Sequence, residues 1–196
     1  MNKKNIPNVL TFLRIVSVPF FIYFLLCDSN YIFASFIFII ASVTDFLDGY
    51  FARKFNAISN FGTFFDPLAD KLLVISCFVS FLYIELLQES VLLWMIVVIV
   101  FRDVSITLLR LLIQSKNMTM ITTKVAKAKT AFQMGSIGLI LFYLTLIQSQ
   151  YLILEYIQFN LIIFYLMTAT ALVTLYTGIH YYYNNSHLLI KVFSKE

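Results

Sequence analysis

The chain has 196 residues, of which 61% are hydrophobic and 12% are charged, and its mean hydropathy is +0.88. Soluble globular domains are nearer half apolar and a quarter charged, so this composition excludes most soluble folds and predicts an all-α integral membrane protein. With 5 Gly and 3 Pro the chain is neither disordered nor collagen-like, and its net charge of +4 comes from scattered basic residues rather than a nucleic-acid-binding patch.

Six apolar stretches are long enough to cross a bilayer, which takes about 20 residues in a helix. They cover residues 9–27, 31–51, 61–83, 90–113, 126–147 and 152–182. Lys3 and Lys4 precede the first stretch as in a signal peptide, but no small-residue cleavage site follows it, and we interpret it as an uncleaved helix. The sequence therefore predicts a single membrane domain, residues 1–196, with six transmembrane helices.

The placement of Lys and Arg between these stretches predicts their orientation. On one side of the membrane we expect Lys3, Lys4, Arg53, Lys54, Lys116, Lys124, Lys191 and Lys195. The opposite loops, near residues 28–30, 85–89 and 148–155, contain no Lys or Arg. The positive-inside rule then places both termini in the cytoplasm, and we expect a multi-pass protein of the cell (inner) membrane.

Four aspartates lie within or at the edge of the second and third stretches, where an unpaired charge is costly. Asp45 and Asp48 are three residues apart and Asp66 and Asp70 four apart, so each pair shares a helix face. The short connection predicts antiparallel neighbours, with the two pairs facing each other near the cytoplasmic surface. Gathered carboxylates need cations, and their hard oxygens favour Mg²⁺, with Mn²⁺ or Ca²⁺ also fitting.

Small residues and one arginine accompany these acids. Gly49, Ala52 and Gly62 leave room for a ligand close to the backbone, and Arg53 offers a planar donor fork suited to phosphate. The alternative is a structural ion-pair cluster with Arg53 and Lys71, but four acids against two bases would leave it under-neutralised. A divalent metal beside an arginine is suited to a diphosphate that undergoes displacement.

The segment from Asp45 to Asp70 reads D-x2-D-G-x2-A-R-x8-G-x3-D-x3-D and resembles the complete signature of the CDP-alcohol phosphotransferases. That resemblance implies a fold of six transmembrane helices and a homodimer. It implies metal ligands at Asp45, Asp48, Asp66 and Asp70, with Asp70 also the general base. It implies contacts to the CDP group from Gly49, Ala52, Arg53 and Gly62. The reaction implied is attack of an alcohol on the β-phosphorus of a CDP-linked lipid, with CMP leaving.

Within the family, the opening N-I-P-N-V-L-T-F-L-R and residues 41–74 are similar to bacterial phosphatidylglycerophosphate synthases. This likeness implies CDP-diacylglycerol as donor, glycerol 3-phosphate as acceptor, and a role for Asn8 in holding the cytidine.

Basic residues further along the chain fit an anionic acceptor. Arg102 and Arg110 are eight residues apart in the fourth stretch, and Lys127 and Lys129 open the fifth. The pattern R-x7-R followed by K-x-K resembles the glycerol-phosphate site of those synthases. The alternative is that Arg102 pairs with Asp103 and that the lysines only mark topology. His180, His187 and the tyrosines at 181–183 are interpreted as interfacial residues.

Three other functions stay open. Asp103 stands where the synthases commonly have Glu, which is compatible with a eukaryote-type cardiolipin synthase whose acceptor is phosphatidylglycerol. A phosphatidylinositol phosphate synthase is the next alternative. An ion-coupled transporter would need titratable groups across the bilayer, whereas residues 72–83 carry no charge.

Overall fold

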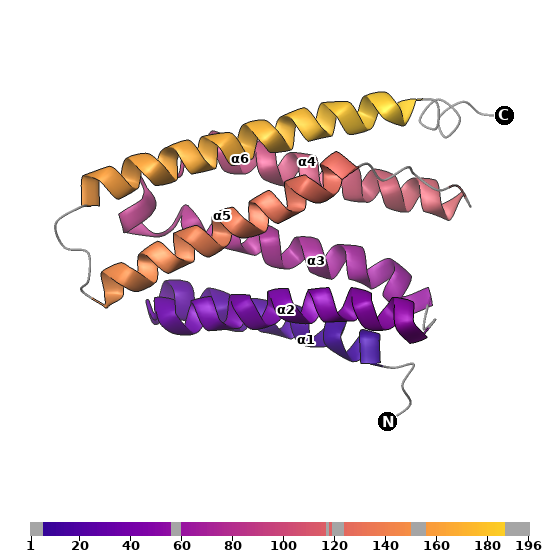
Figure 1. Cartoon of the computed structure of the whole chain (residues 1–196), viewed down its shortest axis with the longest axis horizontal. Coiled ribbons are helices and arrows are strands. Elements are labelled where there is room, and N and C mark those ends of the chain that lie inside the picture. The colour runs from indigo at the N-terminus through magenta and orange to yellow at the C-terminus, as the bar shows by residue number, and fades with distance from the viewer. Residues whose placement is uncertain (1–5, 56–59, 117, 119–123, 150–155, 187–196) are drawn as a thin grey trace.

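A computed structural model describes residues 6–186 except 56–59, 117, 119–123 and 150–155. Side chains are described for the same residues apart from 6–8, 46–55, 60–67, 70, 124–127 and 156–158. Within this part of the chain there are six α-helices and no strand, which confirms the all-α prediction. They are α1 (Ile6–Ile22), α2 (Tyr31–Phe55), α3 (Asn60–Phe81), α4 (Leu93–Ser115), α5 (Lys124–Gln148) and α6 (Tyr156–Asn184), shown in Figure 1.

Each α-helix covers most of one apolar stretch. Among the described residues, three segments are long and apolar enough to cross a membrane. These are Val9–Cys27, Ala128–Gln148 and Phe159–Asn184. Tyr31–Asp45 in α2 and Lys71–Phe81 in α3 are apolar but shorter. Helix α4 has the length but carries Arg102 and Asp103 near its middle and Arg110 nearer its end, so composition alone does not mark it as a span. The count of six spans stays a prediction.

The helices lie side by side along the long axis of the molecule (Figure 1). Helix α1 packs on α2 and α3, α4 packs on α6 and α3, and α5 crosses between α2 and α6. Because the chain reverses between helices, one end of the bundle collects the start of α1, the end of α2, the start of α3 and the end of α6. The predicted aspartate site lies at this end.

Large apolar side chains fill the centre of the bundle and also cover its outside. The core contains Phe21, Cys77, Phe78, Ile99, Ile137 and Met167, all fully buried. Phe101, Phe142 and Tyr165 are among many large apolar side chains that face outward and are more than half exposed. Helices that are apolar on every face belong in a bilayer, so the protein is a membrane protein.

Polar contacts join α2 to α5 at the end of the bundle away from the aspartates. After a short π-helix, η2 (Tyr23–Cys27), the chain turns through Ser29, whose φ is 50°. The Gln148 side chain accepts a hydrogen bond from the Ile32 amide at 3.2 Å and donates one to the Ser29 carbonyl at 3.3 Å. The hydroxyls of Ser35 and Thr145 lie 3.1 Å apart. These contacts fix the turn at one end of the bundle, and the predicted functional residues lie at the opposite end.

Candidate active site

The backbone places the aspartates as two pairs on two helices. Helix α2 is continuous through Asp45 and Asp48, and α3 is continuous through Asp66 and Asp70. Residues three or four apart share a helix face, so each pair lies on one face of its helix. Of these four acids the structure describes only the side chain of Asp45. The other predicted metal and CDP-lipid side chains lie outside the described set: Asn8, Asp48, Gly49, Ala52, Arg53, Gly62, Asp66 and Asp70. Their convergence stays a prediction.

Asp45 has a partner that the sequence patterns did not identify. Arg14 of α1 places its Nη2 atom 2.8 Å from Asp45 Oδ1. Only 2% of the Arg14 side chain is exposed, whereas 43% of the Asp45 side chain is. A buried arginine thus holds one oxygen of a half-exposed carboxylate. The signal that could have revealed Arg14 is its charge in an apolar span, where an ionisable residue marks a functional site by default.

The donor chemistry of this end fits a hard divalent cation. All four predicted ligands offer carboxylate oxygens, and the one described carboxylate is accessible from outside the bundle. Among the side chains that the structure describes, no group of three or more His, Cys, Asp or Glu could hold a metal. Asp48, Asp66 and Asp70 lie outside these described side chains, so the metal site stays a prediction.

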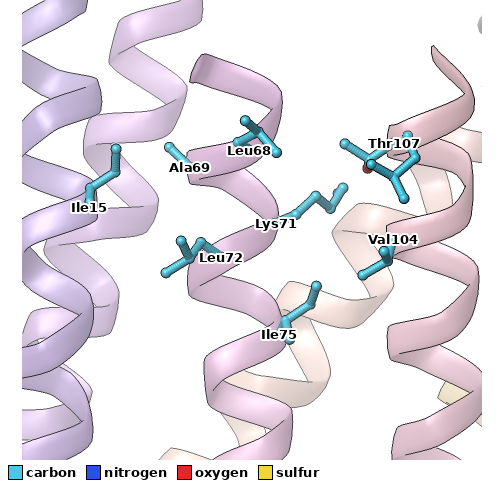
Figure 2. Close-up of a pocket in the computed structure, with 9 residues that line it drawn as sticks. Ile15, Leu68, Ala69, Lys71, Leu72, Ile75, Val104 and Thr107 are labelled. Carbon is cyan, nitrogen blue, oxygen red and sulfur yellow. The ribbon is translucent and has the colours of Figure 1, made fainter. Parts of the chain in front are cut away.

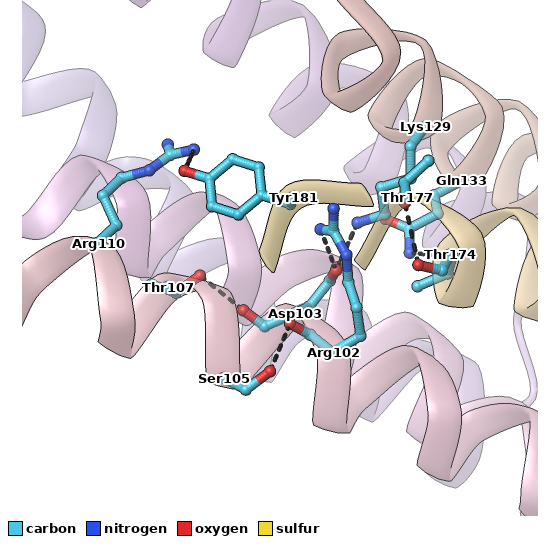
Figure 3. A network of polar contacts seen from close by, with 10 residues as sticks. All are labelled: Arg102, Asp103, Ser105, Thr107, Arg110, Lys129, Gln133, Thr174, Thr177 and Tyr181. Carbon is cyan, nitrogen blue, oxygen red and sulfur yellow. Dashed lines mark hydrogen bonds and ion pairs between the residues drawn. The ribbon is translucent and has the colours of Figure 1, made fainter. Parts of the chain in front are cut away.

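The predicted acceptor residues Arg102 and Lys129 meet at a buried carboxylate (Figure 3). Lys129 of α5 donates to Asp103 Oδ1 at 2.5 Å and to Oδ2 at 2.7 Å. Arg102 Nη1 donates to the same Oδ1 at 3.1 Å. Lys71 of α3 interacts electrostatically with Asp103 and with Lys129. Three cations around one acid leave the cluster positively charged. The pairing of Arg102 with Asp103, considered above as an alternative, is therefore present.

Arg110 lies two turns further along α4 and contacts α6. Its Nη2 donates to the hydroxyl of Tyr181 at 3.3 Å (Figure 3). Tyr181 is buried, while its neighbours Tyr182 and Tyr183 are exposed. The interfacial interpretation of the three tyrosines is therefore wrong for Tyr181. Three identical residues in a row do not indicate which one faces the core. Lys127, the remaining predicted acceptor residue, has a side chain outside the described set.

A row of buried polar residues continues from this cluster between α5 and α6. Gln133 Nε2 donates to Thr174 Oγ1 at 3.2 Å (Figure 3), and the hydroxyls of Ser136 and Thr170 lie 2.8 Å apart. Lys129, Gln133 and Ser136 are four and three residues apart, so they share one face of α5. These bonds align α6 with α5 beside the cations.

An apolar groove of about 450 Å³ opens between α1, α3 and α4 (Figure 2). Its lining is Ile15, Leu68, Ala69, Lys71, Leu72, Ile75, Val104, Thr107 and Leu108. Lys71 extends across the groove towards α4 (Figure 2). The groove is lined by Lys71, the residue after Asp70, and by Val104, the residue after Asp103, so it adjoins both groups of predicted site residues.

A model of the family described as CDP-alcohol phosphatidyltransferase matches residues 4–176. The chain belongs to this family. The match includes both aspartate pairs and the predicted acceptor residues on α4 and α5, and it ends before Gly178 and Tyr181. Family membership agrees with the resemblance drawn from the Asp45–Asp70 motif and makes the chain an enzyme.

Several relatives carry the same name, CDP-diacylglycerol–glycerol-3-phosphate 3-phosphatidyltransferase. The chain is 33% identical to the one from Bacillus subtilis (strain 168) over 153 residues, which are 71% of this chain and 77% of the relative. It is 34% identical to that of Rickettsia typhi over 140 residues, 70% and 76% of the two chains. It is 37% identical to that of Cereibacter sphaeroides over 143 residues, 69% and 62%.

Proposed function

We propose that this enzyme transfers the phosphatidyl group of CDP-diacylglycerol to glycerol 3-phosphate, giving phosphatidylglycerophosphate and CMP in phospholipid biosynthesis. The observation that carries this proposal is the likeness to relatives of that name over about 70% of the chain. The positively charged cluster on α3, α4 and α5 supports an acceptor that bears a phosphate, because buried cations need an anion.

The four aspartates have two proposed roles, metal binding and proton transfer. Asp45, Asp48, Asp66 and Asp70 would hold a divalent ion, Mg²⁺ or Mn²⁺, and Arg14 orients Asp45. The bound ion would neutralise the diphosphate of the donor. Asp70 takes the proton from the attacking hydroxyl, and the leaving CMP is contacted by Asn8, Gly49, Ala52, Arg53 and Gly62. Arg102, Arg110, Lys127 and Lys129 bind or surround the acceptor phosphate.

The apolar groove suits part of an acyl chain of the lipid donor. Apart from Lys71 and Thr107 its lining is aliphatic, and it opens to the outside of the bundle. Lys71, which lines the groove and interacts electrostatically with Asp103, would place a cation beside the polar headgroup of a lipid bound there.

We also propose the membrane arrangement. Six spans with both termini in the cytoplasm and the active site at the cytoplasmic face of the cell membrane account for the loops that hold Lys and Arg. A homodimer is the assembly that the family resemblance implies.

Cardiolipin synthesis from phosphatidylglycerol is the second candidate, and one contact favours it. Asp103 stands where the synthases commonly have Glu, and both its oxygens accept hydrogen bonds from Lys129. This pairing neutralises part of the positive cluster, which suits the singly charged phosphodiester of phosphatidylglycerol.

The test is CMP release by the purified protein in detergent with CDP-diacylglycerol and Mg²⁺. Glycerol 3-phosphate, phosphatidylglycerol and inositol 1-phosphate are supplied in parallel. We expect release with glycerol 3-phosphate alone, and its loss on adding EDTA. Release with phosphatidylglycerol instead would reject the proposed acceptor and support cardiolipin synthesis, while activity in EDTA would reject the metal.

A further inference from the structure

Helix α6 contacts both arginines of the proposed acceptor site. Gly178 lies against the aliphatic stem of Arg102, and Tyr181 accepts a hydrogen bond from Arg110. The two α6 residues are three apart and therefore share the helix face that packs on α4. Neither residue belongs to the segment that the family match covers.

Glycine is the only residue type at position 178 that leaves room for the observed conformation of Arg102. A Cβ atom at position 178 would be 2.8 Å from Arg102 Cγ and 3.6 Å from its Nε. Arg102 is 8% exposed and its guanidinium is held by Asp103, so its stem has little freedom to move away. Glycine inside a helix costs about 1 kcal/mol relative to alanine, and at position 178 the close approach of Arg102 gives it a packing reason.

Two further glycines in the bundle differ from Gly178. A Cβ at Gly135 or Gly138 of α5 would meet nothing within 4 Å. Among the three glycines that the structure describes, only the one facing Arg102 has a steric requirement for a missing side chain. The buried Nε of Arg102 has no hydrogen-bond partner among the described residues, so this donor is available to an anion.

Tyr181 contacts the second arginine, Arg110. Its side chain is 1% exposed and its hydroxyl lies 3.3 Å from Arg110 Nη2. A buried aromatic ring has few rotamers, so the hydroxyl is a rigid acceptor for a long, flexible side chain. Tyr183, two residues later, is 81% exposed and is a matched residue without this contact.

We propose that α6 positions the acceptor-binding arginines, with Gly178 fixing the path of Arg102 and Tyr181 fixing the direction of Arg110. This proposal rests on the proposed function, because it assigns the two guanidinium groups to the acceptor phosphate. Gly178 and Tyr181 touch the arginines and not the reacting atoms, so they are positioning residues. Replacing either residue should therefore weaken binding of the acceptor and leave binding of the CDP-lipid unchanged.

The experiment compares Gly178→Ala and Tyr181→Phe with the controls Gly138→Ala and Tyr183→Phe. The KM values for acceptor and CDP-diacylglycerol are measured by CMP release. We expect the acceptor KM to rise about tenfold in Gly178→Ala and about five-fold in Tyr181→Phe, with the CDP-diacylglycerol KM unchanged. Both controls should match the wild type. An unchanged acceptor KM in Tyr181→Phe would overturn the proposal even if Gly178→Ala does not fold.

Double variants show whether each residue acts through its arginine. Gly178→Ala should have no further effect in an Arg102→Ala protein, because the clashing Cγ is gone. Tyr181→Phe should likewise add nothing to Arg110→Ala. Multiplying effects would mean that α6 acts elsewhere, and the proposal would be wrong.

The same assay separates this proposal from the proposed function. If the wild type used phosphatidylglycerol or inositol 1-phosphate instead, the function would fail, and the variants would be compared with that phosphate-bearing acceptor. A raised KM for it would support the role of α6, and an unchanged one would overturn it. No CMP release with any of the three acceptors would overturn both proposals.

Discussion

Arg14 and Asp45 form a contact between a fully buried cation and a half-exposed carboxylate. The guanidinium fixes one oxygen of Asp45 and reduces the negative charge where four acids are expected to gather. Arginine suits this role because its planar fork holds a carboxylate in one orientation. The end of the bundle where we propose a metal site thus includes a residue from α1, well outside the aspartate motif.

Replacing Arg14 tests this dependence. We expect Arg14→Met to lower kcat about tenfold or more, because a carboxylate that has lost its orienting partner no longer presents its oxygens in one geometry. Arg14→Lys should retain more activity, since it keeps the charge and loses only the fork. CMP release and the melting temperature in detergent are measured together. A folded Arg14→Met protein with full activity would remove Arg14 from the site.

Asp70 carries the proposed proton transfer. Asp70→Asn keeps the size of the side chain and removes its basicity, so kcat should fall by about 10²- to 10⁴-fold. The melting temperature should stay close to that of the wild type. Near-normal turnover would contradict the assignment of Asp70 as the base.

At the scale of elements, α4 and α5 are joined by the Asp103–Lys129 pair, in which both side chains are buried. Removing one member leaves a buried charge without its main partner, which costs about 3–5 kcal/mol. We expect Lys129→Met to lower the melting temperature clearly. The double variant Asp103→Leu with Lys129→Met should recover much of that stability but not the acceptor affinity. A stable Lys129→Met protein would show that the pair does not hold α4 to α5.

The groove between α1, α3 and α4 provides another test. Leu108→Trp should occupy part of it and raise the KM for CDP-diacylglycerol several-fold, because an acyl chain would have to displace the indole. Leu112→Trp is the matched control: Leu112 is one turn further along α4, is equally exposed at 53%, and does not line the groove. Equal KM values for the two variants would contradict the acyl-chain assignment.

The elements themselves were largely predictable. Each apolar stretch became one helix, because a bilayer-length run of Leu, Ile, Phe and Val has no other way to satisfy its backbone. The short helical turns η2 and η3 (Glu85–Leu87) were not predicted, since they depend on how neighbouring helices end. Helix α4 was predicted as the stretch 90–113, but its three charged residues keep it out of the segments that are apolar enough to cross a membrane by composition. It packs on α3 and α6 through one face.

At the scale of the whole molecule, the orientation in the membrane is a prediction from charge. The start of α1 and the end of α6 lie at the same end of the bundle (Figure 1). A reporter fused after Glu196 should therefore be active in the cytoplasm, and so should one fused before Met1. Labelling of either terminus from outside intact cells would contradict the proposed topology.

The sequence by itself determined the membrane class, the helical segments and the aspartate motif. These are local properties. Long apolar stretches favour a bilayer over water, and residues three or four apart share a helix face whatever surrounds them. The same locality predicted that Arg102 and Arg110 belong to one helix. It also predicted the family, since the signature lies within a single run from Asp45 to Asp70.

Only the tertiary structure decided which side chains those residues meet. Lys129 lies 26 residues from Asp103, and Tyr181 lies 71 residues from Arg110. Helical periodicity gives the face of a residue but not the helix that packs against it, and several packings of six apolar helices bury similar areas. Long-range steric fit and charge pairing select among them, as where Gly178 admits the stem of Arg102 and Asp103 neutralises Lys129.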